Sequence, residues 1–171
     1  MTPVRNVFLI VLALLVQSTV FGRFDIFGAR PDFGMLVLIF IAGGVSGEAA
    51  VLYGFFIGFM QDVYTPEFLG SNAFTMSLMG FFLGILRETI TVEHVAVSIS
   101  ITAVACLVHD IMYLSFYTVF EFPLIFRLFV RESIGGAVYT SVLALVLVSG
   151  SRWIAGGGFK SVLRRIDGIG R

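Results

Sequence analysis

The sequence predicts an all-α integral membrane protein, folded as a compact bundle of six transmembrane helices without a soluble domain. Apolar side chains make up 58% of the 171 residues and charged ones only 13%, whereas soluble domains average roughly 45–50% and about 25%. The mean hydropathy is +1.00. Six spans of about 20 residues leave roughly 50 residues for loops and tails. That remainder excludes the loop-rich globule that most hydrolases, kinases and nucleic-acid binders need for their sites.

Six apolar runs are the expected helices. They cover residues 7–21, 33–42, 48–60, 68–86, 92–120 and 128–148. The first run has the length of a signal peptide, but no small-residue cleavage site follows it and further apolar runs do, so we interpret it as an uncleaved span. The second run begins after Pro31 and Asp32, residues that suit the first turn of a helix. Glycines at 43–47 separate it from the third run and predict a tight helical hairpin.

Polar residues mark the ends of the later runs. The third run stops at Asp62, and Ser71 and Asn72 are suited to cap the start of the fourth. Pro123 ends the fifth run, because proline does not continue a helix interior. The sixth run carries Arg131 in its first turns. We expect one bundle over residues 1–155, followed by a separate tail at 156–171.

The distribution of basic residues predicts the orientation in the membrane. With the N-terminus inside, the inner segments hold seven Lys and Arg residues and the outer segments four. This bias predicts that both termini are cytoplasmic. In the tail, Lys160, Arg164 and Arg165 fall on one side of a short amphipathic helix, which we expect to lie on the membrane surface with its cations toward anionic lipid. The zero net charge gives no indication of a nucleic-acid partner.

Small residues recur four apart on two of the expected helices. Gly54 and Gly58 lie on the third, and Gly80 and Gly84 on the fourth. This spacing lets helix backbones approach closely in a bilayer, where lipid gives no hydrophobic drive for association. Two interpretations follow. The glycines form either a contact inside the monomer or an apolar, small-residue groove for the helix of a partner.

Two acidic positions deserve separate interpretations. Asp62 is suited to accept hydrogen bonds from the free N–H groups at the start of the fourth span, or alternatively to face a cavity or a partner. Asp110, next to His109 inside the fifth span, is a functional candidate because ionisable groups within a bilayer are costly. It is expected to form a structural ion pair with Arg131. A contact with a partner or substrate, and a proton relay, are the other interpretations.

Catalytic and metal-binding patterns are missing from the sequence. It contains no G-x-S-x-G, no H-E-x-x-H, no phosphate-cradling loop and no paired-aspartate motif of an intramembrane protease. Two histidines, the single Cys106 and scattered acids do not suggest a metal site. Cys106 lies in an apolar stretch and is expected to be a packing residue. We therefore expect no enzymatic activity, no metal and no cofactor.

Several segments together resemble the bacterial rod shape-determining MreD family. They are the Pro31-Asp32 start of the second run, GFFIGFMQD at 54–62, LGSNA at 69–73 and GFFLG at 80–84, in an order and spacing that cover roughly residues 30–88. Asp32, Asp62, Gly70 and Asn72 match the family pattern and become candidate structural or partner positions. Asp110 and Arg131 are supported by the bilayer argument alone.

The resemblance implies a non-catalytic scaffold of the cell elongation machinery in the inner membrane. Its implied partners are an MreC-like protein with a single span, MreB, a RodA-type glycosyltransferase and a penicillin-binding transpeptidase, and its implied role is to support peptidoglycan synthesis. The family is also similar to the membrane-embedded substrate-binding subunits of energy-coupling-factor transporters. That similarity suggests an alternative function, a substrate-binding subunit of a vitamin-type transporter.

Overall fold

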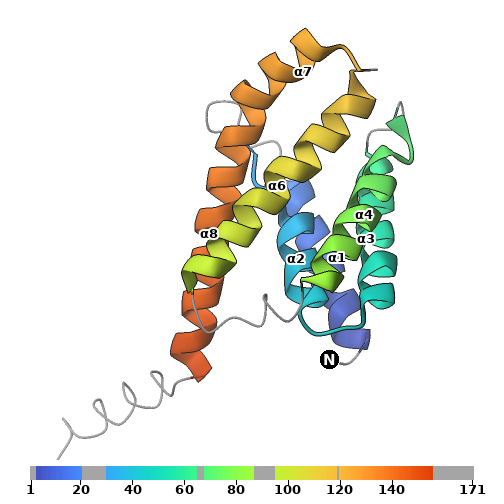
Figure 1. Cartoon of the computed structure of the whole chain (residues 1–171). Helices are drawn as coiled ribbons and strands as arrows, with labels where there is room; N and C mark the ends of the chain where they lie inside the picture. The colour runs from blue at the N-terminus through green and yellow to red at the C-terminus, as the bar shows by residue number, and fades with distance from the viewer. Residues whose placement is uncertain (1–2, 21–29, 65–67, 87–94, 119, 156–171) are drawn as a thin grey trace, which may run out of the picture.

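The computed structural model describes residues 3–20, 30–64, 68–86, 95–118 and 120–155, and within these ranges the chain is helical with short connections (Figure 1). The elements are α1 (Pro3–Val20), α2 (Phe33–Ala42), α3 (Gly47–Asp62), α4 (Ser71–Ile85), α6 (Val95–Tyr117), α7 (Phe122–Leu128), the π-helix η2 (Phe129–Ser133) and α8 (Ile134–Ala155). Each of the six expected helices is therefore present. The predicted tail, with Lys160, Arg164 and Arg165, lies outside the described residues.

The helix ends agree best with the sequence where a local signal sets them. α2 occupies the predicted second run, and a short turn joins it to α3, as expected for a hairpin. The start of the last helical segment was predicted too late. Helix begins again at Phe122 with Pro123 in its first turn, and it continues through η2 into α8. Proline is suited to the first turn of this segment, because the N–H groups of first-turn residues have no partner inside the helix.

α2 is the central helix of the bundle. It contacts α1, α3, α4, α6 and α8, and seven of its residues are buried. Its 10 residues span only about 15 Å, about half of the roughly 30 Å hydrocarbon thickness of a bilayer. The second run is thus a short core helix within the bundle. α6 and α8 are much longer and cross each other on one side of it, while α1, α3 and α4 lie on the other side (Figure 1).

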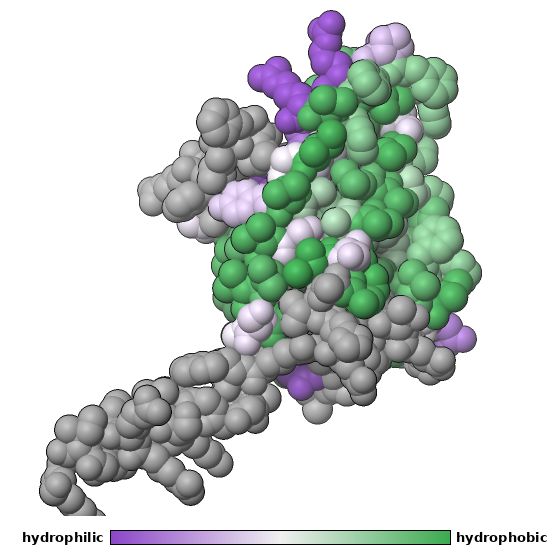
Figure 2. Space-filling model, turned by 60° about the vertical axis from the view of Figure 1, so that its left-hand side comes forward, coloured by the Kyte–Doolittle hydropathy of each residue, from purple (hydrophilic) through white to green (hydrophobic). Residues whose placement is uncertain are grey.

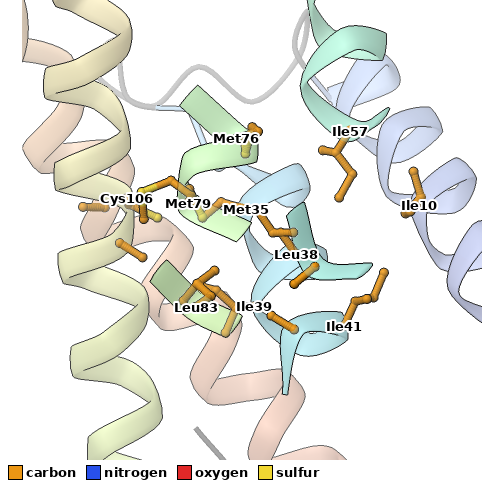
Figure 3. Packing of buried hydrophobic residues seen from close by; sticks show 14 residues of the cluster. Ile10, Met35, Leu38, Ile39, Ile41, Ile57, Met76, Met79, Leu83 and Cys106 are labelled. Atoms are coloured by element: carbon orange, nitrogen blue, oxygen red, sulfur yellow. The ribbon is translucent and has the colours of Figure 1, made fainter. Parts of the chain in front are cut away.

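The hydrophobic core forms around α2 (Figure 3). All six main helices contribute buried apolar side chains to it. Its members are Ile10, Met35, Leu38, Ile39, Ile41, Ala42, Ala50, Ile57, Met76, Met79, Leu83, Ala105, Cys106 and Ala137. Cys106 packs within this cluster and is 3% exposed, which confirms its interpretation as a packing residue.

The outer surface is also apolar. Large hydrophobic side chains are exposed on α1, α3, α4, α6 and α8, and Figure 2 shows a mostly hydrophobic face with strongly hydrophilic residues toward its ends. Two stretches, Ile99–Tyr117 and Phe122–Gly150, are long and apolar enough to cross a membrane, and Pro3–Thr19, Phe33–Ala42 and Ser71–Ile85 are shorter apolar helices. Such an exterior fits a lipid environment. The crossing of the bilayer by six helices stays a prediction.

Candidate functional site

The connection between α3 and α4 is organised by one buried carboxylate. Asp62, the last residue of α3, is 0% exposed. Its Oδ2 accepts hydrogen bonds from the backbone N–H of Gly70 and of Ala73, both at 2.9 Å, and its Oδ1 accepts one from Asn72 at 3.0 Å. The negative charge therefore lies at the positive end of the α4 dipole. This confirms the interpretation of Asp62 as an acceptor for the free N–H groups of the fourth span.

The expected capping by Ser71 and Asn72 is wrong. The N-cap residue of α4 is Gly70, which has no side chain to make a capping hydrogen bond. Gly70 has φ +101°, a left-handed conformation that glycine adopts without a Cβ penalty. The chain turns tightly here, so Asp62 of the preceding helix reaches the N–H groups that a local Ser or Asn would otherwise take. Asn72 is buried and contributes its backbone N–H to the carboxylate.

The glycine stripes of α3 and α4 face each other. A Cβ added to Gly54 would lie 2.2 Å from the carbonyl oxygen of Met76, and one added to Gly58 would lie 2.2 Å from that of Asn72. From the other side, a Cβ on Gly80 would lie 2.3 Å from the carbonyl oxygen of Ala50. We call this contact the glycine seam; Gly84 extends it against Gly47. The monomer interpretation is confirmed, and the expected open groove along these glycines is wrong because the partner helix is supplied by the chain itself.

A second polar cluster surrounds Asp32 at the start of α2. Asp32 Oδ1 accepts a hydrogen bond from the backbone N–H of Met35 at 2.9 Å and one from Gln61 Nε2 at 3.3 Å. The Asp32 backbone N–H donates to Thr140 Oγ1 of α8 at 3.0 Å. Gln17 Oε1 of α1 accepts from the backbone N–H of Gly34 at 3.2 Å. The short helix α2 is thus capped by Asp32 and fastened to three neighbouring helices at this end.

α6 adds His109 and Asp110 to the cluster. His109 Nδ1 lies 3.2 Å from Asp110 Oδ1 and 4.0 Å from Asp32 Oδ2. The His109 ring is buried and stacks on Tyr113, with ring centroids 6.3 Å apart. The expected ion pair between Asp110 and Arg131 is not formed; Asp110 instead contacts its own neighbour on the helix, and Arg131 is exposed.

Two cavities open beside this cluster. The larger one, of about 700 Å³, is lined by residues of α1, α3, α4, α6, α7 and η2 and of the segment just before α2, and its wall includes Asp32, Gln61, His109 and Asp110. The smaller one, of about 490 Å³, lies between α6 and α8. Arg131 and Asp110 both line the smaller cavity, so these two predicted residues are brought to one site without being paired.

Several residues of the site were missed by the sequence reasoning. Gln17, Gln61 and Thr140 reach the end of α2 from α1, α3 and α8, and Arg30 and Glu132 line the larger cavity. The available signal was the presence of amide side chains inside or at the end of apolar runs, which are costly in a bilayer. In the described part of the chain, no group of three or more His, Cys, Asp or Glu residues is arranged to hold a metal ion.

Comparison with known families gives one result that covers most of the chain. The model of the family described as rod shape-determining protein MreD matches residues 3–149. Comparisons with curated proteins and with solved structures found no match. The matched range includes the α3–α4 joint, the glycine seam and the polar cluster at the start of α2. The chain therefore belongs to the MreD family of rod shape-determining proteins.

Proposed function

We propose that this protein is a non-catalytic scaffold of the cell elongation machinery in the bacterial inner membrane. The family match over residues 3–149 is the observation that carries the proposal. In this role it binds the single span of an MreC-like partner and supports peptidoglycan synthesis. MreB, a RodA-type glycosyltransferase and a penicillin-binding transpeptidase are the further members of the assembly.

We assign the MreC-like span to the outer side of α3, because the glycine seam is already occupied by α4. This surface consists of Leu52, Phe55, Phe56 and Phe59, and we call it the α3 aromatic face. Phe55 and Phe59 stack with centroids 6.1 Å apart, and Phe55 meets Phe56 edge to face. The close contact between α3 and α4 on the opposite side of α3 holds this helix in position. Rigid aromatic side chains supply much of the binding energy at protein interfaces.

Co-purification from gently solubilised native membranes tests the proposal. We expect the tagged protein to recover an MreC-like single-span protein in near-equal amount, together with cell-wall synthases, by mass spectrometry. Recovery of a bound small molecule with ATPase subunits, and of no such partner, would overturn the scaffold in favour of the vitamin-type transport subunit. Small molecules in the same eluate are identified for that reason.

Variants of the α3 aromatic face test the assigned surface. Phe55→Ala combined with Phe59→Ala should leave the protein folded and reduce partner recovery about tenfold or more, because hot-spot side chains each contribute about 2 kcal/mol or more. Phe8→Ala removes a phenylalanine from α1 that is even more exposed than Phe55 and Phe59, and it serves as the control. Equal recovery with the double variant and the control would place the partner elsewhere.

A further inference from the structure

The larger cavity lies beyond the N-terminus of α2. α2 begins at Phe33, and the cavity is lined by residues of α1, α3, α4, α6, α7 and η2 and of the segment just before α2. The cavity volume of about 700 Å³ falls within the roughly 300–1,000 Å³ typical of small-ligand pockets. The π-helix η2 brings Glu132 to this wall, and π-bulges occur frequently at functional sites.

The wall of the cavity carries more negative than positive groups. Asp32, Asp110 and Glu132 provide three carboxylates. Arg30 provides one cation, which has an interaction of its own. A protonated His109 would still leave the acids of this wall in excess, and Arg131 lines the adjoining smaller cavity instead. A bound group that carries a positive charge is therefore favoured over an anion.

Two polar atoms in this wall are buried without a hydrogen-bond partner among the described residues. They are His109 Nε2 and Gln61 Oε1. His109 is 5% exposed, and its Nδ1 is already next to Asp110. Such atoms are rare in folded proteins and call for a bound group or water. Asp32 Oδ2 lies 4.0 Å from His109 Nδ1, so the carboxylate belongs to the same polar group as these two atoms.

Aromatic rings complete the lining. Tyr64, Tyr113 and Tyr117 border the cavity, and Tyr113 stacks with both His109 and Tyr117 along α6. Carboxylates beside tyrosine rings are the surroundings that stabilise an organic ammonium group, through charge-assisted hydrogen bonds and cation–π contact.

We propose that this cavity binds an organic ammonium group, contributed by a phospholipid headgroup such as ethanolamine or by a small soluble amine. The ammonium donates to Asp32 Oδ2 and to the Asp110 carboxylate. A hydroxyl or phosphate oxygen on the same ligand takes a hydrogen bond from His109, and a ligand N–H or O–H donates to Gln61 Oε1. This site is separate from the α3 aromatic face, and no partner protein is needed to occupy it.

The test uses the purified, delipidated full chain in detergent, with native mass spectrometry and thermal unfolding as readouts. The probes are phosphatidylethanolamine, its N-acetylated form, phosphatidylglycerol with the same acyl chains, and free ethanolamine and lysine. We expect phosphatidylethanolamine or a free amine to bind about tenfold more tightly than the N-acetylated lipid and phosphatidylglycerol, both of which lack the ammonium group. Preference for the phospholipid identifies a lipid source, and preference for a free amine identifies a soluble one.

Charge-removing variants assign the binding to this cavity. Asp110→Asn and Glu132→Gln should each abolish the preference for the amine, because they keep the side-chain shape and remove the charge. Glu121→Gln removes an exposed acid that lies outside both cavities and should leave the preference unchanged. Equal binding of all lipids, no binding of any probe, or an unchanged preference in both cavity variants overturns the proposal.

Discussion

Asp62 shows how a carboxylate is accommodated in an apolar bundle without a counter-ion among the described residues. Three backbone N–H groups at the start of α4 surround it, and these are groups that would otherwise lack partners at a helix N-terminus. The same three hydrogen bonds thus stabilise the buried carboxylate and give the free N–H groups at the start of α4 their acceptors. Asp32 has a comparable role for α2, where its carboxylate accepts from the Met35 N–H, but Asp32 also lines the larger cavity.

Replacing Asp62 by Asn should destabilise the fold. The amide lacks the charge and offers one acceptor oxygen in place of two, so we expect a loss of about 2–4 kcal/mol in the free energy of unfolding. Thermal unfolding of the purified protein in detergent measures the effect. Glu121→Gln, at an exposed position, is the matched control. A variant that unfolds at the wild-type temperature would mean that the three hydrogen bonds do not hold the α3–α4 joint.

At the scale of helices, the glycine seam makes α3 and α4 the most extensively packed pair among the described elements. The atoms closest to the missing Cβ groups at Gly54, Gly58 and Gly80 are backbone carbonyls. Backbone, unlike the end of a side chain, does not move aside without shifting the whole helix. The seam therefore sets the distance between the two helices and fixes the direction of the α3 aromatic face.

Alanine substitution in the seam should be destabilising despite its small size. Gly54→Ala and Gly58→Ala each force α3 and α4 apart, and we expect a loss of about 1–3 kcal/mol in the free energy of unfolding, as in other overpacked cores. Gly150→Ala is the matched control, since a Cβ at Gly150 in α8 meets nothing within 4 Å. Alanine there should be neutral or stabilising by up to about 1 kcal/mol.

The opposite ranking, with Gly150→Ala more harmful than the seam variants, would contradict the packing of α3 on α4. Loss of MreC-like partner recovery in a seam variant that has kept its unfolding temperature would instead indicate that partner binding depends on the position in which the seam holds α3.

At the scale of the whole molecule, the short helix α2 contacts five longer helices. The bundle has an apolar core, an apolar exterior and, at one end of α2, a cavity with charged side chains in its wall. Polar groups within a bilayer face the protein interior or a cavity, because lipid offers them no hydrogen bonds. The residues around Asp32 follow that rule.

Cysteine labelling tests the predicted orientation. Buried Cys106 is the single cysteine of the chain, so the native protein should give little background with a membrane-impermeant maleimide. Gly44→Cys, in the α2–α3 turn, should be labelled only when the cytoplasmic side is accessible, and Tyr64→Cys, beyond the end of α3, only from the outside. Both sites reacting from one side would contradict a crossing by α3 and the six-span topology.

The sequence by itself determined the helical class, the approximate positions of the helices and the family. Apolar runs, and the glycine, proline and polar residues at their ends, are signals that act within a few residues along the chain. It also identified Asp62 as the acceptor at the α3–α4 joint. Two predictions from the sequence were wrong: the capping of α4 by Ser71 and Asn72, and the ion pair of Asp110 with Arg131. The first assumed that a helix is capped by residues at its own start, and the second that charges on neighbouring antiparallel helices pair.

Only the tertiary structure decided which groups meet across helices. Gln17, Asp32, Gln61, His109 and Thr140 are spread over more than 120 positions of the sequence, yet they meet at one end of α2. Their meeting depends on the depth at which a short helix lies among long ones and on how the helices cross. Those quantities arise from packing between distant segments, which no local spacing in the sequence encodes.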